Sequence, residues 1–342
     1  MKNLFDYATK ELSQDAFLRW LFENYNCENE SVRNSFRKLF DSFTDNKFVD
    51  KTITDLITVA QWKNIDISIW FKVDEEEHLI VIEDKTGSGI HDNQLNTYAA
   101  EINGHNGYWL EKENSGYARC PRFVKEDSKI FKIFYKTNIV NQWERNATQN
   151  DELGKWKCYD VYSIYELFKD IKTDNEVLGY YIEYIKKIYS YAKRETNPSE
   201  WELISWHSFF NDYQAPDCIS SIKEINCYQK EYYYIKLFVK GQENDLPCFE
   251  IRSRDFAFNT NTEKYSITIR AVLYNLENQA TKEAISNWQE LLKSHGFDLN
   301  YRKDTSKHKQ IATITIDDIE NNEKDIFNAL NKTSELLSKI FY

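Results

Sequence analysis

A strand–turn–strand unit in the first half of the chain constrains its fold more than any other segment. Residues 65–73 and 79–85 are rich in β-branched and aromatic side chains, and four acidic residues, 74–77, separate them. Such runs on either side of a polar turn predict the two antiparallel strands of a hairpin. The second run begins with four aliphatic residues, as in a strand buried on both faces, and ends in Glu83-Asp84-Lys85. Three ionisable residues at the end of a buried strand must lie at a cleft or be paired.

The alternation of side chains along a strand places Glu83 and Lys85 on one face of the predicted hairpin and Asp84 on the other. With the turn centred in the middle of the acidic run, Asp66 lies opposite Lys85, and Ser68 lies opposite Glu83. Asp66 and Glu83 are then diagonal neighbours, roughly 7–8 Å apart at Cα, and two carboxylates at this distance can bind one divalent cation. We therefore expect Asp66, Glu83 and Lys85 to meet at one end of the hairpin.

This trio has the chemistry of a phosphodiesterase centre. Carboxylates suit Mg²⁺ or Mn²⁺, which lowers the pKa of a bound water and offsets charge on a phosphate. A neighbouring lysine can orient that water or stabilise the charge that develops in the transition state. The alternative is that Asp66, Glu83 and Lys85 are solvated charges at strand ends, which is the ordinary role of such residues. The aliphatic run before Glu83 favours the interpretation as a metal-binding site over that as solvated charges.

Periodicity elsewhere in the first half predicts alternating helices and strands. In a helix from about residue 13 into the low twenties, the residues Leu12, Ala16, Phe17, Trp20 and Leu21 form one apolar stripe at helical spacing. The further expected elements are strands over 53–62 and 130–136, and helices over 92–102, near 160–170 and over 175–195.

A break in helical periodicity near residues 195–199, at a proline, predicts a domain boundary. We expect one domain over residues 1–195 and a second over 200–342. The second domain has its own pattern, which predicts an α+β arrangement. Its expected strands lie near 228–240, 248–256, 265–274 and 309–316, and its expected helices near 280–294 and 321–340.

Composition excludes several classes of protein. The net charge of −11 argues against a histone-like coat of basic charge, although a nucleic-acid enzyme depends on the local field of its cleft and stays open. The six cysteines show no metal-binding spacing. No run approaches the roughly 18 apolar residues of a membrane helix, and the acidic start is unlike a signal peptide. We therefore expect a soluble, cytoplasmic protein.

The residues of the hairpin resemble a known family. Asp66 and Glu83-x-Lys85, in their strand–turn–strand setting, look like the motif of the PD-(D/E)XK nuclease superfamily. One departure is that Ile65 stands where the family motif has a proline before the aspartate. The carboxylate does the binding, so the departure leaves the resemblance intact.

Two further segments extend the resemblance, which covers roughly residues 5–170. Residues 11–21 are similar to the first helix of a bacterial branch of the superfamily, in which a glutamate adds to the metal site, and Glu11 matches that glutamate. A Gln-x-x-x-Tyr helix follows the lysine strand in the family, and Gln94 and Tyr98 match it. These two residues, four apart, share one face of the expected helix.

The resemblance implies an α/β fold with a restriction-endonuclease-like αβββαβ core and a mixed central sheet. It implies an Mg²⁺- or Mn²⁺-dependent nuclease that acts on DNA, and by analogy a role in bacterial defence against foreign DNA. The implied metal ligands are Asp66, Glu83 and Glu11; the implied catalytic residues are Asp66, Glu83, Lys85 and Gln94. For substrate binding we expect Tyr98, and also Gly87, because a glycine loop directly after Lys85 can approach a ligand closely.

The second half carries no motif that identifies it. Arg252 and Arg254 are expected to share a strand face, and with Arg270 and the basic loop 302–309 they could bind substrate phosphates. A solvated sheet face explains these residues equally well. Target recognition, homodimerisation and ligand sensing all remain open for this half. The rival for the whole chain is a non-catalytic nucleic-acid-binding or regulatory protein that retains the nuclease fold, and an RNA-directed enzyme is a third alternative.

Overall fold

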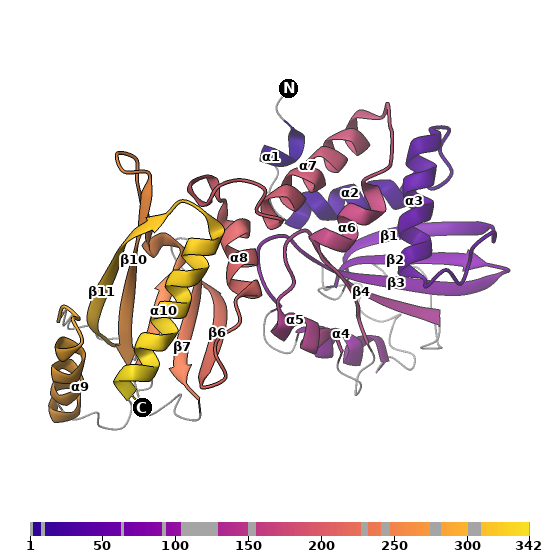
Figure 1. Cartoon of the computed structure of the whole chain (residues 1–342). Coiled ribbons are helices and arrows are strands. Elements are labelled where there is room, and N and C mark those ends of the chain that lie inside the picture. The colour runs from indigo at the N-terminus through magenta and orange to yellow at the C-terminus, as the bar shows by residue number, and fades with distance from the viewer. Residues whose placement is uncertain are drawn as a thin grey trace. The chain divides into compact units, whose positions relative to one another are not determined.

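The computed structural model divides the chain into two compact units, Met1–Ala192 and Lys193–Tyr342 (Figure 1). Each unit has its own sheet and its own apolar core, and each is described by itself. No helix within the described residues is long and apolar enough to cross a membrane. The structure describes residues 3–7, 11–62, 65–90, 94–103, 129–149, 155–226, 232–240, 247–273, 282–299 and 309–341.

The first unit is built on a mixed sheet with the strand order β1-β2-β3-β4-β5 in its described residues. The first three strands form an antiparallel meander, whereas β4 runs parallel to β3, and β5 parallel to β4. A parallel pair needs a crossover, and the chain between β3 and β4 includes helix α4. The strands are β1 (Ile53–Trp62), β2 (Ile65–Val73), β3 (Glu76–Lys85), β4 (Ile130–Lys136) and β5 (Lys157–Tyr159).

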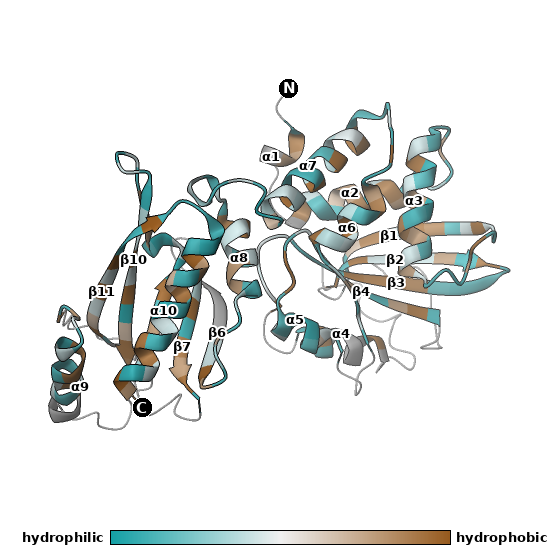
Figure 2. Cartoon of the chain, viewed as in Figure 1, coloured by the Kyte–Doolittle hydropathy of each residue, from teal (hydrophilic) through white to brown (hydrophobic). Residues whose placement is uncertain are grey.

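Helices cover both faces of this sheet, and each face has its own apolar cluster (Figure 1). One face, which we call the rear face, carries α1 (Leu4–Tyr7), α2 (Glu11–Glu23), α3 (Glu30–Phe43), α6 (Val161–Phe168) and α7 (Glu176–Ala192). The other, the front face, carries α4 (Gln94–Asn103) and α5 (Gln142–Thr148). Apolar residues concentrate along the strands between these layers (Figure 2). The first unit is therefore mixed α/β with a three-layer core.

The hairpin between β2 and β3 has a shorter turn than the sequence predicted. Val73 pairs with Glu76, so the turn contains only Asp74 and Glu75, which have φ angles of 49° and 64°. Positive φ at both central residues is the signature of a two-residue type I′ turn, whose twist matches that of the strands. The predicted four-residue turn was wrong, and every cross-strand partner moves by two positions.

A shift of two positions changes the partners but keeps each side chain on its face. The observed register, Ile67 with Ile82, continues by one residue to place Asp66 across from Glu83 rather than Lys85. Ser68 pairs with Val81, not with Glu83. Asp66 and Glu83 are thus direct neighbours, which is closer than the diagonal arrangement that the sequence predicted.

Helix α2 is also rotated relative to the predicted apolar stripe. Leu12 is 68% exposed, and Ala16 is exposed as well. Phe17 and Leu21 are buried as expected, but Gln14, at 3% exposure, takes a place on the buried face. The stripe prediction assumed that α2 would bury apolar residues in preference to polar ones, and the structure does not follow that rule at this position.

The second unit has an antiparallel sheet with the order β11-β10-β8-β7-β6, and β9 pairs with β10. Residues of α8, α9 and α10 join the strands in one apolar cluster. The elements are α8 (Leu203–Asp212), β6 (Ile219–Asn226), β7 (Tyr232–Val239), β8 (Cys248–Arg252), β9 (Phe256–Asn259), β10 (Lys264–Leu273), α9 (Lys282–Ser294), β11 (Lys309–Glu320) and α10 (Glu323–Phe341). The second unit also contains the short 3-10 turns Pro198–Glu200 and Ser253–Asp255.

Candidate active site

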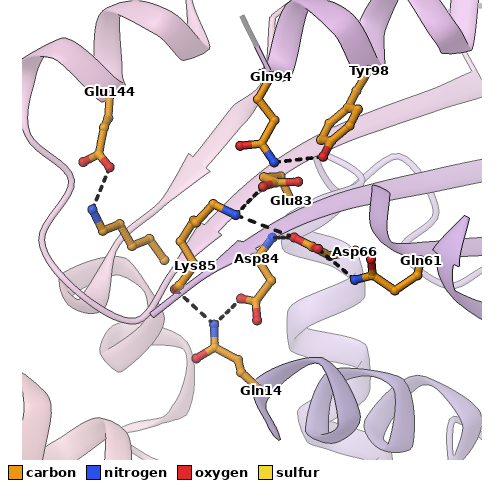
Figure 3. Close-up of polar contacts among 10 residues, drawn as sticks. Gln14, Gln61, Asp66, Glu83, Asp84, Lys85, Gln94, Tyr98 and Glu144 are labelled. Carbon is orange, nitrogen blue, oxygen red and sulfur yellow. Dashed lines mark hydrogen bonds and ion pairs between the residues drawn. The ribbon is translucent and has the colours of Figure 1, made fainter. Parts of the chain in front are cut away.

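The structure brings Asp66, Glu83 and Lys85 together at the front face, where β2 begins and β3 ends (Figure 3). Lys85 Nζ forms an ion pair with Glu83 Oε1 and lies 4.0 Å from Asp66 Oδ2. Glu83 is fully buried, the Lys85 side chain is 6% exposed and the Asp66 side chain is 15% exposed. Asp66 is therefore the member of this trio that solvent reaches most easily.

Burial and charge make Glu83 an unusual carboxyl group. Its pKa is raised to about 8, first by desolvation and then by the neighbouring charge of Asp66, while Lys85 acts in the opposite direction. Among the described residues none donates a hydrogen bond to Glu83 Oε2. At pH 7 a carboxyl group with this pKa is largely protonated, and a bound cation would favour its ionised form.

Asp66 is held by hydrogen bonds to both of its carboxylate oxygens. The backbone N–H of Asp84 donates to Asp66 Oδ2 at 2.8 Å, and Gln61 Nε2 donates to Asp66 Oδ1 at 3.1 Å (Figure 3). Gln61 has a φ of 53°, which is uncommon for a residue with a side chain. Its role at Asp66 was not foreseen from the sequence.

Helix α4 places Gln94 and Tyr98 over this corner of the front face (Figure 3). Gln94 Nε2 donates to the Tyr98 hydroxyl at 2.8 Å, as expected for side chains four residues apart on a helix. The pKa of Tyr98 is raised to about 12, mainly by burial and then by the charge of Glu83. Tyr98 is only 6% exposed, so it reaches the site as a buried wall residue.

A second polar cluster, which was not predicted from the sequence, lies on the rear face of the sheet behind the trio. Asp84 points away from Glu83 and Lys85, as predicted, and its carboxylate Oδ1 accepts a hydrogen bond from Gln14 of α2 (Figure 3). Desolvation, followed by the charge of Asp15, raises the pKa of Asp84 well above its ordinary value. The signal was available in the sequence, because Gln14 lies four and seven residues before Leu18 and Leu21 of the buried stripe.

A buried ion pair stands beside the trio on the front face. Lys136 of β4 is the register partner of Lys85, and its Nζ lies 2.6 Å from Glu144 Oε1 of α5. An added Cβ at Gly89 would come within 3.4 Å of the same Glu144 oxygen, so the segment after Lys85 packs closely on this pair. No local sequence pattern links residues 136 and 144, and the pair was not predicted.

Other predicted site residues have different outcomes. Glu11 begins helix α2, but its side chain lies outside the described residues. An added Cβ at Gly87 would meet no atom within 4 Å, so the space beside this glycine is open. In the second unit, Arg252 ends β8 and pairs with Glu250, whereas Arg254 lies in the following 3-10 turn.

The expectation that Arg252 and Arg254 share a strand face was therefore wrong. The chain leaves the strand after Arg252, and Asp255 of the turn accepts a hydrogen bond from the Arg252 backbone N–H at 3.2 Å. Arg270 donates to both carboxylate oxygens of Asp255. The guanidinium of Arg270 is thus paired with an acid. The basic residues 302–308 lie outside the described residues, as does the side chain of Lys309.

The donor set at Asp66 and Glu83 fits a divalent cation with oxygen ligands. No group of three or more His, Cys, Asp or Glu side chains within the described residues could enclose a metal ion. Mg²⁺ sites commonly use one or two carboxylates and retain several waters, so two carboxylates with an unpartnered oxygen meet that requirement.

No protein-family model, curated protein or solved structure matches the chain.

Proposed function

We propose that this protein is a divalent-metal-dependent nuclease that hydrolyses phosphodiester bonds, with DNA as the expected substrate. One observation carries the proposal. Two carboxylates and one ammonium, from Asp66, Glu83 and Lys85, converge at a single corner of the sheet. Ion pairs alone would not require Glu83 to be fully buried with an oxygen that no described residue satisfies.

The order of elements supports the same conclusion. In the first unit α2 precedes the antiparallel strands β1, β2 and β3, and α4 and the parallel strand β4 follow. With α1 and α3 as additional helices before β1, this order is compatible with the αβββαβ core and mixed sheet that the PD-(D/E)XK resemblance implies. The proposed site lies at the start of the second strand of the meander and the end of the third.

Each residue has a defined role in the proposal. Asp66 and Glu83 would hold the cation, which when bound lowers the pKa of water and neutralises phosphate charge. Lys85, already within 4.0 Å of Asp66, would orient the attacking water and stabilise charge on the phosphate in the transition state. Gln94 would help to place the substrate, with the hydrogen bond to Tyr98 fixing the orientation of its side chain.

A substrate panel tests the proposal. Single-stranded DNA, double-stranded DNA and RNA are incubated with the full chain in Mg²⁺, in Mn²⁺ and in EDTA. We expect metal-dependent cleavage of DNA, and loss of at least 100-fold in rate for Lys85→Met, which keeps most of the apolar stem of the side chain. Cleavage of RNA alone would reassign the substrate.

Lys72→Met is the matched control. Lys72 lies on β2 of the same sheet and contacts Asp55 at 3.0 Å and Glu77 at 3.7 Å, but it stands at the other end of the strand. This variant should cleave like the wild type. Equal activity of the Lys85 and Lys72 variants would remove the catalytic assignment.

The non-catalytic rival predicts a different pattern. A binding module would give no cleavage of any substrate with Mg²⁺ or Mn²⁺, together with nucleic-acid binding that weakens steeply with salt. The same panel, run at two salt concentrations with a binding readout, separates the two functions.

A further inference from the structure

Helix α2 buries polar side chains although it leaves an apolar side chain exposed. Gln14 is 3% exposed and Asp15 is 5% exposed, while Leu12 on the same helix is 68% exposed. Rotating the helix to bury Leu12 instead would recover apolar burial and spare the desolvation of an amide and a carboxyl group. The observed orientation therefore needs a specific partner for Gln14, and β3 supplies it.

That partner is the end of β3 that carries the proposed site. The Gln14 amide Nε2 donates to Asp84 Oδ1 and lies 3.5 Å from the backbone carbonyl oxygen of Lys85 (Figure 3). The backbone N–H of Asp84 donates in turn to Asp66 Oδ2 at 2.8 Å. Asp84 thus joins α2 on the rear face to the metal-binding carboxylate on the front face.

We propose that Gln14 is a positioning residue that fixes the end of β3 and so sets the separation of Asp66 and Lys85. The inference rests on the proposed nuclease function. A glutamine suits the task because its amide has two N–H donors, one for a carboxylate and one for a carbonyl. A glutamate at this position would place a second acceptor against Asp84, and an apolar residue would leave the Asp84 oxygen unsatisfied.

The position of Gln14 sets what its loss should do. It lies behind the sheet, so it does not touch substrate, and the KM for nucleic acid should stay within about twofold. Partners that orient metal ligands typically contribute 10–100-fold in metal affinity or activity, so the affinity for Mn²⁺ and the kcat should each fall by about that factor. A merely structural role would lower stability without this split between kcat and KM.

The test compares Gln14→Met with Thr44→Val. Methionine keeps the length of the side chain and removes both donors. Thr44 is a fully buried residue at the end of α3, and its hydroxyl donates to the Phe40 carbonyl oxygen at 2.8 Å, so valine removes a buried hydrogen bond that does not involve β3. Gln14→Asn, which keeps an amide but is one methylene too short, provides a second variant if methionine unfolds the unit.

Three readouts are made on the full chain: amide hydrogen exchange of residues 79–90, Mn²⁺ affinity by isothermal titration, and kcat and KM on DNA. We expect Gln14→Met to speed exchange at 83–86 by tenfold or more, with protection of α7 retained, and to weaken Mn²⁺ binding and kcat as stated. Thr44→Val should leave all three readouts near those of the wild type.

The outcomes separate the two proposals. Unchanged exchange at 83–86 in Gln14→Met overturns the positioning role, whether or not the protein cleaves DNA. Faster exchange with unchanged Mn²⁺ affinity and kcat in an active protein also overturns it. A wild type that binds no Mn²⁺ and cleaves nothing removes the nuclease proposal, and the positioning role then falls with it.

Discussion

The buried pair Lys136–Glu144 gives the sharpest prediction about stability near the site. Its atoms Nζ and Oε1 are 2.6 Å apart, and the side chains are 3% and 0% exposed. Glu144 also accepts a hydrogen bond from the Asn141 backbone N–H at 2.9 Å, within the capping box of α5. Either single truncation therefore leaves a charged group in a dry site with its main partner gone.

The magnitude follows from that burial. Removing one member of a buried ion pair destabilises a protein by about 3–5 kcal/mol, whereas replacing both with apolar residues is often close to neutral. We expect Lys136→Met and Glu144→Leu each to lower the free energy of unfolding by about 3 kcal/mol or more. The ion-pair contribution to the loss of unfolding free energy should be smaller in the double variant than in either single variant. The lost cap of α5 should add about 1 kcal/mol to the loss in the double variant.

The assay must report on the first unit alone, because a chain with two compact units need not unfold in one step. Native-state hydrogen exchange of the amides of β3 and β4 meets this need. A double-mutant cycle on these amides should give a coupling energy of about 2 kcal/mol or more. Single variants that lose less than 1 kcal/mol, or losses that simply add in the double variant, would refute the reasoning.

Three further predictions concern groups away from the site. Burial lowers the pKa of His78 below its ordinary value of 6.5, so between that lowered pKa and 6.5 the unfolded chain binds more protons than the folded one. Stability of the first unit should therefore fall as pH drops below about 6.5, and His78→Phe should flatten this dependence in urea titrations at several pH values. Glu75 has a φ of 64°. Its replacement by glycine should raise the free energy of unfolding by up to about 1 kcal/mol, whereas alanine should give no such increase, as melting temperatures would show. Partial burial raises the pKa of Cys158 to about 11, so iodoacetamide at pH 8 should alkylate it at least tenfold more slowly than a cysteine in an unstructured peptide, measured by mass spectrometry; equal rates would contradict the raised pKa.

The sequence predicts the face of each hairpin residue but not the length of the turn. Alternation has a period of two, so Asp66, Glu83 and Lys85 share a face in any register that differs by an even number of residues. A run of four acids contains no preference for one turn over another. The observed turn aligns Lys72 with Glu77, and their charged atoms lie 3.7 Å apart, a contact that only the correct register provides.

Helix α3 could have been predicted from the sequence and was not. The residues Val32, Phe36, Leu39, Phe40 and Phe43 are all buried and recur at helical spacing. Asn29 precedes them as an N-cap, and its side chain accepts a hydrogen bond from the Val32 backbone N–H at 3.1 Å.

Other features depend on packing that no local pattern contains. The rotation of α2 about its own axis follows from the contact between Gln14 and Asp84, two residues 70 positions apart. Hydrophobic periodicity assigns Leu12 to the core because it cannot anticipate a polar partner on the sheet. The pair Lys136–Glu144 likewise depends on where α5 packs on the front face. Such departures from the apolar pattern are expected where function, rather than stability, selects the residue.

Direct titration with Mn²⁺ tests the central claim most simply. Isothermal titration of the full chain should show a divalent-cation site that Asp66→Asn and Glu83→Gln each weaken at least tenfold, while Asp55→Asn, on the neighbouring strand β1, leaves it unchanged. Mn²⁺ binding that is absent, or that survives both site substitutions, would contradict the assignment of this corner of the sheet as a metal-dependent hydrolytic centre.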